Sequence, residues 1–581
     1  MISTRERERA TSYEQPKKMT TPRLLALAAL CCGAALAASA PSPASNLLTE
    51  YLGADEAILI NSLAPRFSWL VASADRGVDQ ASFRIVVTQE TAPPAVVWDS
   101  GVVASAATTH VPYAGAPLAS DTVYSWTVTW TDSNGATAPA SAPARFGTGL
   151  LTQAEWAPSA WIGCPLGPSM HQIRAEFDLG LAAGVTIQQA RIYITAVGYY
   201  DLRVNGDWAG QWSGMTRPRL DPGWTTYEMT SLYNAYDITQ SLVPSGPNAI
   251  AIMLGNGWPD IGPVPGNNSY AAAGEQPTPA ELVAARLAGP RPHEKITDNN
   301  GELRQTRVQV RVRTSDGKTT TWASTAAGFR RARGAGEAAL GDWMCGAGAL
   351  QYDNVYNGCT WDQTKATLGW DLPGYSYATG AWAPAVLKAD PGGAHPTAMT
   401  PQAFPAVTVQ AEIKPISVSS PAPGVYVLDF GQNFAGFVRL TLPAPVPAGL
   451  AIKLRHAELL MHPPYGPKDG NIYVGNLRSA LATDLYTTGG VTEGFEVWEP
   501  VFTYHGFRFV EVTGLPFTPT IDMITGVHIR TGVQMAGNVV SPSLTAAPLN
   551  QLQHAIQWGL ANNFMSVISD CPQRDERKGW M

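Results

Sequence analysis

The densest group of side chains that could perform chemistry lies at the C-terminal end of the sequence. Residues 570–580 read Asp-Cys-Pro-Gln-Arg-Asp-Glu-Arg-Lys-Gly-Trp. Carboxylates and arginines bind sugar hydroxyls through charge-assisted hydrogen bonds, and a tryptophan offers an apolar face to a pyranose ring. A carboxyl group that stays protonated can donate to a glycosidic oxygen. These residue types therefore fit a carbohydrate site, although composition alone favours a solvated charged loop.

A helix must position this stretch. Leu549, Leu552, Ile556 and Leu560 recur at helical spacing, which predicts a helix over about 548–563. Its apolar stripe requires a partner surface. Since the sequence ends at Met581, we expect it to stop near the beginning of a helical domain.

The preceding residues predict a mainly β fold. Short alternating runs separated by Gly, Pro and Asn turns indicate an immunoglobulin- or fibronectin-like sandwich over 46–150. The same pattern with longer loops indicates a jelly-roll-like sandwich over 151–400 and a second one over 401–533. The predicted fold class is therefore a series of tandem β-sandwich domains followed by the first helix of a further domain, 534–581.

Composition excludes other classes of protein. The 581 residues are 45% hydrophobic and 15% charged, which excludes a disordered chain and fits about four domains. The net charge of −7 implies no basic surface for nucleic acid.

Residues 1–40 are predicted to be a secretory signal peptide. Arg23 precedes an apolar run, and Ala38-Ser39-Ala40 fits a cleavage site for small residues. We expect a secreted, extracellular protein with no membrane segment after the signal is removed, because no later run contains 18 apolar residues. The alternative is a retained membrane anchor.

Four cysteines remain after the predicted signal: Cys164, Cys345, Cys359 and Cys571. Their spacing fits no zinc motif, so no metal site is predicted from them. Export would permit disulfides. Cys345 and Cys359 are the closest pair in sequence, but the sequence cannot choose among the three full pairings.

The C-terminal motif resembles the signature of bacterial-type α-L-rhamnosidases, glycoside hydrolase family 78, which runs Asp-Cys-Pro-Gln-Arg-(Asp/Glu)-Glu-Arg-x-Gly-Trp. Segments 425–440, 454–460, 471–487 and 502–514 are similar to the β-sandwich that lies beside the family's catalytic barrel. Earlier segments are similar to its N-terminal sandwich and its leading immunoglobulin-like module, so that the resemblance covers 46–581.

The resemblance implies a concanavalin-like sandwich over 401–533 and the start of a six-hairpin (α/α)6 barrel, truncated, over 534–581. It implies hydrolysis of terminal non-reducing α-L-rhamnose from glycosides or polysaccharides, with inversion. Two alternatives stay open: a non-catalytic rhamnose- or carbohydrate-binding fragment, and a fragment without function.

The resemblance assigns roles to five residues of the motif. Glu576 would be the general acid, and Asp570, Arg574, Asp575 and Trp580 would bind the substrate. Such an acid needs a raised pKa, from burial or from neighbouring carboxylates. The structural alternatives are a loop-stabilising salt bridge for Arg574 and a capping hydrogen bond for Asp570.

An inverting enzyme also needs a carboxylate base roughly 6.5–9.5 Å from the acid. In the family this base follows the motif by a couple of hundred residues, beyond Met581, so the chain alone is expected to be inactive. Lys578 and Met581 depart from the commoner residues of the motif. Cys359 stands where the family commonly has a glutamate.

The N-terminal sandwich contains a second candidate site. In some family members this domain binds rhamnose with the help of calcium, and Asn205 and Trp224 lie in the matching segments, with Asp201 nearby. The alternative is that Asn205 forms a hairpin turn and Trp224 packs on the sheet. His505 is expected to be a core histidine, and His456 and Glu458 receive no role. No cofactor is predicted apart from this candidate calcium.

Overall fold

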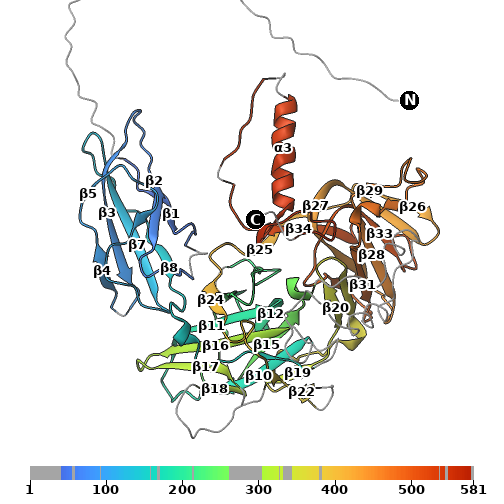
Figure 1. Cartoon of the computed structure of the whole chain (residues 1–581), viewed down its shortest axis with the longest axis horizontal. Coiled ribbons are helices and arrows are strands. Elements are labelled where there is room, and N and C mark those ends of the chain that lie inside the picture. The colour runs from blue at the N-terminus through green and yellow to red at the C-terminus, as the bar shows by residue number, and fades with distance from the viewer. Residues whose placement is uncertain are drawn as a thin grey trace, which may run out of the picture.

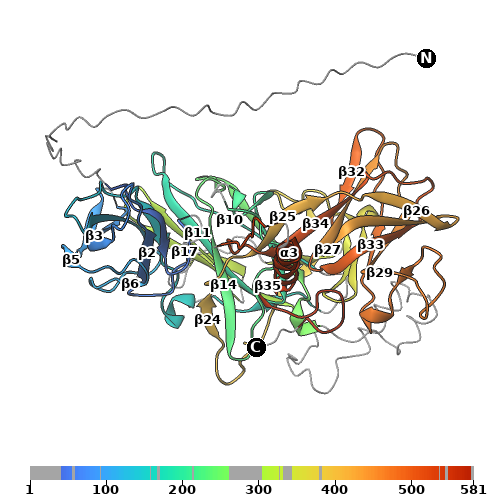
Figure 2. The same ribbon diagram turned by 90° about the horizontal axis from the view of Figure 1, so that it is seen from above.

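The structure is a computed structural model, and it describes residues 41–577 except for 55–58, 92, 158, 166–170, 212–214, 261–303, 326–327, 332–342, 378–381, 536 and 544–546. The predicted signal peptide and Trp580 lie outside the described residues. Three β regions follow one another along the molecule, and helix α3 (Ala547–Asn562) stands on the third (Figures 1 and 2). The predicted fold class, tandem β-sandwiches followed by a helix, is confirmed.

The first region is an immunoglobulin-like sandwich. One sheet is ordered β1-β2-β6 and the other β4-β3-β7-β8, with β5 on β3. Side chains of β7 alternate between buried and partly exposed, because one face of the strand packs on the opposite sheet. The indole of Trp126 donates to Thr49 Oγ1 at 3.1 Å and so joins the two sheets. The strands are β1 (Ser45–Thr49), β2 (Arg66–Leu70), β3 (Gln80–Gln89), β4 (Ala95–Asp99), β5 (Val103–Ala104), β6 (Val111–Pro112), β7 (Val123–Asp132) and β8 (Ala144–Gly147).

The second region packs two sheets face to face around Ile, Val and Ala side chains. They are ordered β13-β12-β15-β10-β19-β22 and β18-β17-β16-β11-β14-β24, with β9 between β16 and β23. The first sheet has β10 (Gln172–Asp178), β12 (Tyr199–Val204), β13 (Asp207–Trp208), β15 (Pro247–Gly255), β19 (Met344–Gly346) and β22 (Trp382–Pro384). The second has β9 (Ile162–Gly163), β11 (Ile187–Val197), β14 (Thr230–Asp237), β16 (Gln305–Thr314), β17 (Thr319–Thr325), β18 (Gly328–Arg331), β23 (Val386–Leu387) and β24 (Ala398–Pro401).

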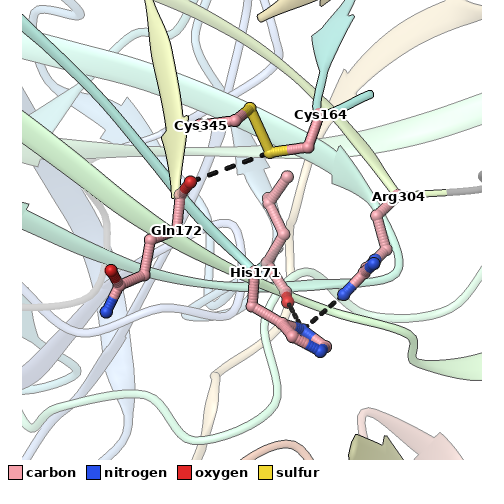
Figure 3. Close-up of a disulfide and its surroundings, with 6 residues drawn as sticks. Cys164, His171, Gln172, Arg304 and Cys345 are labelled. Atoms are coloured by element: carbon pink, nitrogen blue, oxygen red, sulfur yellow. Dashed lines mark hydrogen bonds between the residues drawn. A yellow bond between two sulfur atoms is a disulfide. The ribbon is translucent and has the colours of Figure 1, made fainter. Parts of the chain in front are cut away.

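A disulfide between Cys164 and Cys345 joins two parts of this second region that lie 181 residues apart in sequence (Figure 3). Cys345 belongs to β19, and Cys164 follows β9. Cys359 and Cys571 are free. The closest pair in sequence is therefore not the bonded one, because Cys359 is buried in the sheet of the third region.

The third region is built on one strongly curved sheet, ordered β20-β21-β31-β28-β33-β27-β34-β25, with β26 and β32 also on β27. Its longest strand, β27, shifts register between Asp429 and Phe434, and both β33 and β34 pair with it. The strands are β25 (Val407–Ile413), β26 (Ser417–Ala422), β27 (Val425–Pro443), β28 (Ala451–Ala457), β31 (Thr483–Thr487), β32 (Phe495–Trp498), β33 (His505–Thr513) and β34 (Ile524–Thr531). A small hairpin, β29 (Leu459–Leu460) and β30 (Ile472–Tyr473), lies outside this sheet.

One hairpin crosses from the second region into the third. β20 (Leu350–Asn354) and β21 (Gly358–Asp362) fall inside the predicted 151–400 domain, yet β21 pairs in parallel with β31 of the third sheet. Gly358 turns this hairpin with φ of +112°, and a Cβ there would come within 2.1 Å of the Thr483 carbonyl oxygen. The two sandwiches are therefore interleaved and not merely consecutive.

Helix α3 begins and ends within one residue of the predicted positions. Its Asn562 accepts a hydrogen bond from the backbone of Ala435 at 2.9 Å, and Trp558 packs against His528. The predicted apolar stripe is exposed, with Leu549 63% accessible, since the helix touches the sheet only near its C-terminal end. Within the described residues, the protein has no helix of the length and apolar character needed to cross a membrane.

Candidate active site

After helix α3 the chain runs across the end of the third sheet. β35 (Phe564–Met565) and β36 (Val567–Ile568) pair with each other, and the Ser566 N–H donates to Thr531 Oγ1 at 2.7 Å. The loop 570–575 then lies directly on Gly506 of β33, where a Cβ would come within 2.9 Å of the Gln573 nitrogen. A side chain at position 506 would push this loop away from the sheet.

Arg577 holds the end of the loop against the third region, between the β20–β21 hairpin and the segment before β33. Its guanidinium is fully buried, and Nη1 donates to the carbonyls of Val355 and Tyr504. The guanidinium also lies over the rings of Tyr504, at 4.5 Å, and Tyr356, at 5.5 Å. Burial lowers the pKa of Arg577, against the influence of the tyrosines. Its φ of +34° is strained for a residue with a side chain, so these contacts hold the backbone in an uncommon conformation.

Glu576, the predicted general acid, immediately precedes this clamp. Its backbone carbonyl accepts a hydrogen bond from the Tyr356 hydroxyl at 3.1 Å. Its Oε2 lies 2.7 Å from Arg574 Nη2 and 3.2 Å from Arg478 Nη1, and the side chain is 37% exposed. The backbone is thus fixed while the carboxylate stays accessible, and the partners of that carboxylate are guanidinium groups.

Asp575 connects the loop to the segment after η6 (Gly475–Leu477). Its Oδ1 lies 3.1 Å from Arg478 Nε, and its Oδ2 accepts hydrogen bonds from the hydroxyl and, at 3.3 Å, the backbone N–H of Ser479. Arg478 therefore contacts both Asp575 and Glu576. Together with Arg574, these residues form one charged cluster at the surface, which we call the motif cluster: Arg478, Arg574, Asp575 and Glu576.

Of the two other predicted substrate-binding residues, only Asp570 is described by the structure, and it does not belong to the motif cluster. Asp570 is half-buried at the opposite end of the loop and hydrogen-bonds the Cys571 thiol. Burial and the nearby Asp570 raise the pKa of Cys571 to about 11. Trp580 lies outside the described residues, so its predicted role as an aromatic wall stays a prediction.

Glu458, to which the sequence analysis assigned no role, lies close enough to Arg574 of the motif cluster to feel its charge. Its carboxylate accepts hydrogen bonds from Asn433, at 2.9 Å, and Asn476, at 2.8 Å. Burial raises the pKa of Glu458, while these two amides and the charge of Arg574 act in the opposite direction. Glu458 and Arg478 come from segments distant in sequence, so no local pattern could have placed them beside the motif.

At the predicted second sugar site, the side chains make their contacts within the fold. Asn205 turns the chain between β12 and β13 with φ of +53°, and its amide bonds Ser241 O, Asn248 Oδ1 and the Ala249 N–H. Trp224 packs against Trp258, with ring centroids 6.2 Å apart. The polar atoms of Asn205 are thus engaged within the fold.

Asp201, the carboxylate named beside that second site, pairs with Arg217 at 2.6 Å and Arg203 at 3.3 Å. Calcium at this position therefore stays a prediction. Among the described residues, one group of His, Cys, Asp or Glu side chains has the spacing to hold a metal ion: His456, Asp484 and His505.

Four family descriptions match the chain in the order of its structural regions. Residues 44–152 match the Rha78A-like N-terminal immunoglobulin domain, and 185–410 the alpha-L-rhamnosidase N-terminal domain. Residues 419–530 match the bacterial alpha-L-rhamnosidase concanavalin-like domain, and 543–581 the six-hairpin glycosidase domain. This order defines a multidomain glycoside hydrolase. The chain belongs to the bacterial alpha-L-rhamnosidases of glycoside hydrolase family 78.

Individual relatives agree with this assignment. An alpha-L-rhamnosidase of Streptomyces avermitilis is 35% identical over 74% of this chain and 35% of its own length. One from an Alteromonas species is 28% identical over 89% of this chain and 50% of its own length. The chain thus spans half or less of the length of these two relatives.

Solved structures of the family superpose on the same regions. The alpha-L-rhamnosidase of Dictyoglumus thermophilum has a TM-score of 0.73 at 29% identity, covering 94% of this chain and 55% of that one. The Streptomyces avermitilis enzyme complexed with L-rhamnose has a TM-score of 0.73 at 26% identity, covering 93% and 62%.

Proposed function

We propose that the protein hydrolyses terminal non-reducing α-L-rhamnose from glycosides or polysaccharides. Relatives named as alpha-L-rhamnosidases support the substrate class. The motif cluster supports it chemically, because it collects carboxylates and guanidinium groups at one accessible place, and these are the groups that bind sugar hydroxyls.

The observation that carries this proposal is that the backbone of Glu576 is fixed while its carboxylate is accessible. Its backbone is fixed by Tyr356 and by the buried neighbour Arg577, whereas its carboxylate is exposed between Arg478 and Arg574. A general acid requires such positioning, since the proton must reach the glycosidic oxygen as the bond to rhamnose breaks. In this arrangement the two guanidinium groups favour the carboxylate over the protonated acid, so the proposal requires a bound rhamnoside to displace at least one of them before Glu576 donates its proton.

We assign Asp570, Arg574 and Asp575 to the binding of rhamnose hydroxyls. The proposed stereochemical outcome is inversion, in which a second carboxylate activates water on the opposite face of the sugar. We assign this base to no residue of the described chain.

Glu576→Gln tests the general acid in the protein expressed from its own gene. Hydrolysis of an unactivated rhamnoside should fall about 10²- to 10⁴-fold. Hydrolysis of a nitrophenyl rhamnoside should fall much less, because that leaving group needs little protonation. The exposed carboxylate Glu412 on β25 offers a control, and Glu412→Gln should leave both rates unchanged.

Equal losses on the two substrates would contradict the role of Glu576. Binding of L-rhamnose by the wild-type protein without hydrolysis of either substrate would contradict the enzymatic proposal. That outcome would favour a carbohydrate-binding function.

We also propose that the protein is exported. The Cys164–Cys345 disulfide supports this, because such bonds persist in oxidising compartments. Intact-mass measurement before and after reduction and alkylation, on protein from the culture medium, tests it. Two free thiols at Cys164 and Cys345 in the secreted fraction, or absence of the protein from that fraction, would contradict the proposal.

A further inference from the structure

Three side chains on neighbouring strands converge inside the third sheet. His456 lies on β28, Asp484 on β31 and His505 at the start of β33, and these strands are adjacent in the order β31-β28-β33. His456, Asp484 and His505 each have 0% of their surface exposed. Their potential ligand atoms all lie within 4.8 Å of one another.

Both imidazoles approach the same carboxylate oxygen. His505 Nε2 lies 3.1 Å from Asp484 Oδ2, and His456 Nε2 lies 3.8 Å from it. The two rings are stacked, with centroids 4.1 Å apart. The other oxygen, Oδ1, lies 3.2 Å from His505 Nε2 and accepts a hydrogen bond from the Cys359 N–H at 2.9 Å.

The hydrogen bonds of His456 show which of its ring nitrogens carries the proton. Its Nδ1 lies 3.0 Å from the carbonyl oxygen of Ala482. A carbonyl can only accept, so Nδ1 carries the proton and Nε2 of the neutral ring carries a lone pair. This lone pair faces Asp484 at a distance too long for a hydrogen bond, and Nε2 has no hydrogen-bond partner. Two electron-rich atoms facing each other in a dry interior repel unless positive charge lies between them.

A metal ion can supply that charge, because the tautomer set by the Ala482 carbonyl leaves the lone pair of His456 Nε2 free to bind it.

We propose that His456, Asp484 and His505 bind a structural Zn²⁺ ion. Imidazole nitrogens and carboxylate oxygens bind zinc at about 2.0–2.2 Å, so donors separated by 3.1 and 3.8 Å can share one ion. The hydrogen bond from His456 Nδ1 to a backbone carbonyl is the outer contact that orients metal-binding imidazoles. With no exposed surface, the site would be filled as the protein folds.

The ion would join three strands directly beneath the motif loop. His505 follows Tyr504, whose carbonyl holds Arg577, and precedes Gly506, on which the loop lies. The proposal nevertheless does not depend on hydrolytic activity, because metal content and stability can be measured without substrate.

The first test is elemental analysis of the wild-type chain purified without chelator. We expect about one zinc per chain. Prolonged treatment with a strong chelator should remove the zinc and lower the midpoint of thermal unfolding, and added Zn²⁺ should restore it. A zinc content below about a tenth per chain, with no change in the midpoint on adding Zn²⁺, would overturn the proposal.

Asp484→Asn tests the location, because the amide lacks the negative charge that zinc requires. It should reduce the zinc content to below about a tenth per chain. The matched control is His528→Gln on β34, since His528 is also buried and its Nε2 is also unpartnered, but it packs against Trp558. This variant should keep its zinc. Full zinc in Asp484→Asn, or equal loss in both variants, would overturn the assignment, and the wild-type measurement decides if Asp484→Asn does not fold.

Discussion

Arg174 and Arg577 are both fully buried against tyrosine rings, but the groups that accept hydrogen bonds from them differ. Arg174 on β10 donates to Glu176 and to the Tyr377 hydroxyl, both at 2.5 Å, and to the Leu372 carbonyl at 2.9 Å. Arg577 donates to two carbonyls, and among the described residues no carboxylate lies within ion-pair distance of it.

The difference indicates that one buried arginine contributes to stability and the other to positioning of the proposed acid. Arg174 binds a carboxylate of its own strand and fastens a loop to it, so its contribution is to the stability of the second region. Arg577 is buried among the described residues without an anionic partner, which is costly, and it directly follows the proposed acid Glu576, whose backbone its contacts hold in place. We therefore expect Arg174 to matter for folding and Arg577 to matter for activity.

Arg577→Met should give the largest effect. Without the clamp, Glu576 loses its fixed backbone, and a displacement of about 1 Å can cost about 100-fold in rate. We expect kcat for an unactivated rhamnoside to fall at least about 100-fold per folded molecule. Arg174→Met is the control and should keep its activity per folded molecule. Equal losses in the two variants would remove the distinction between the two sites.

Arg174→Met should have the larger effect on stability. It leaves the Leu372 carbonyl without the Arg174 donor and leaves Glu176 with the hydrogen bond from the Gly374 N–H at 3.0 Å and some contact with solvent. We expect the free energy of unfolding of the second region to decrease by about 2 kcal/mol. Denaturant unfolding of both variants measures this, and a larger loss for Arg577→Met would reverse the comparison.

Two carboxylates, Asp221 and Asp201, allow a similar comparison between a group without an oppositely charged partner and a group that has one, because their protonation changes stability with pH. Burial raises the pKa of Asp221 to about 6, while Gln402 partly offsets this. Although burial acts the same way on Asp201, the charges of Arg217 and Arg203 hold the pKa of Asp201 below its usual value.

The signs of the two pH effects are opposite. For Asp221 the folded state binds the proton more tightly, so stability decreases as pH rises from about 4 to about 6. We expect Asp221→Asn to remove most of that decrease, about 3 kcal/mol. For Asp201, stability is lost instead as pH falls below the carboxyl's ordinary pKa of 3.8. Thermal unfolding of both Asn variants from about pH 2 to about pH 6 measures the difference, and identical pH profiles would contradict it.

The smallest effect is expected at the surface. Arg84 and Asp99 form an ion pair 2.5 Å apart whose side chains are 52% and 38% exposed. Water screens such a pair, so Arg84→Gln should not measurably change the thermal midpoint. A clear decrease in the thermal midpoint would show that exposed ion pairs stabilise this fold despite screening by water.

The sequence predicted features that depend on local pattern. Alternation along β7 and the spacing of Leu549, Leu552 and Ile556 depend only on side-chain period, so the sandwiches and helix α3 were predictable. The C-terminal motif could also be recognised from the sequence, because its residues are contiguous. It placed Glu576, Asp575 and Arg574 in one candidate site.

Features that depend on long-range contact could not be predicted in the same way. The pairing of Cys164 with Cys345 depends on β19 lying beside β10, and the position of Arg478 depends on a loop nearly a hundred residues before the motif. The convergence of His456, Asp484 and His505 likewise requires the strand order, which no residue spacing reveals.

The hairpin formed by β20 and β21 has a consequence for synthesis on the ribosome. It emerges with the second sandwich, but its partner strand β31 is made later, after β25 to β28. Until then the edge of β21 that will face β31 has unpaired backbone N–H and C=O groups, and such edges pair with strands of other chains. Nascent chains released before β31 has docked should therefore aggregate through β21, whereas chains released afterwards should not.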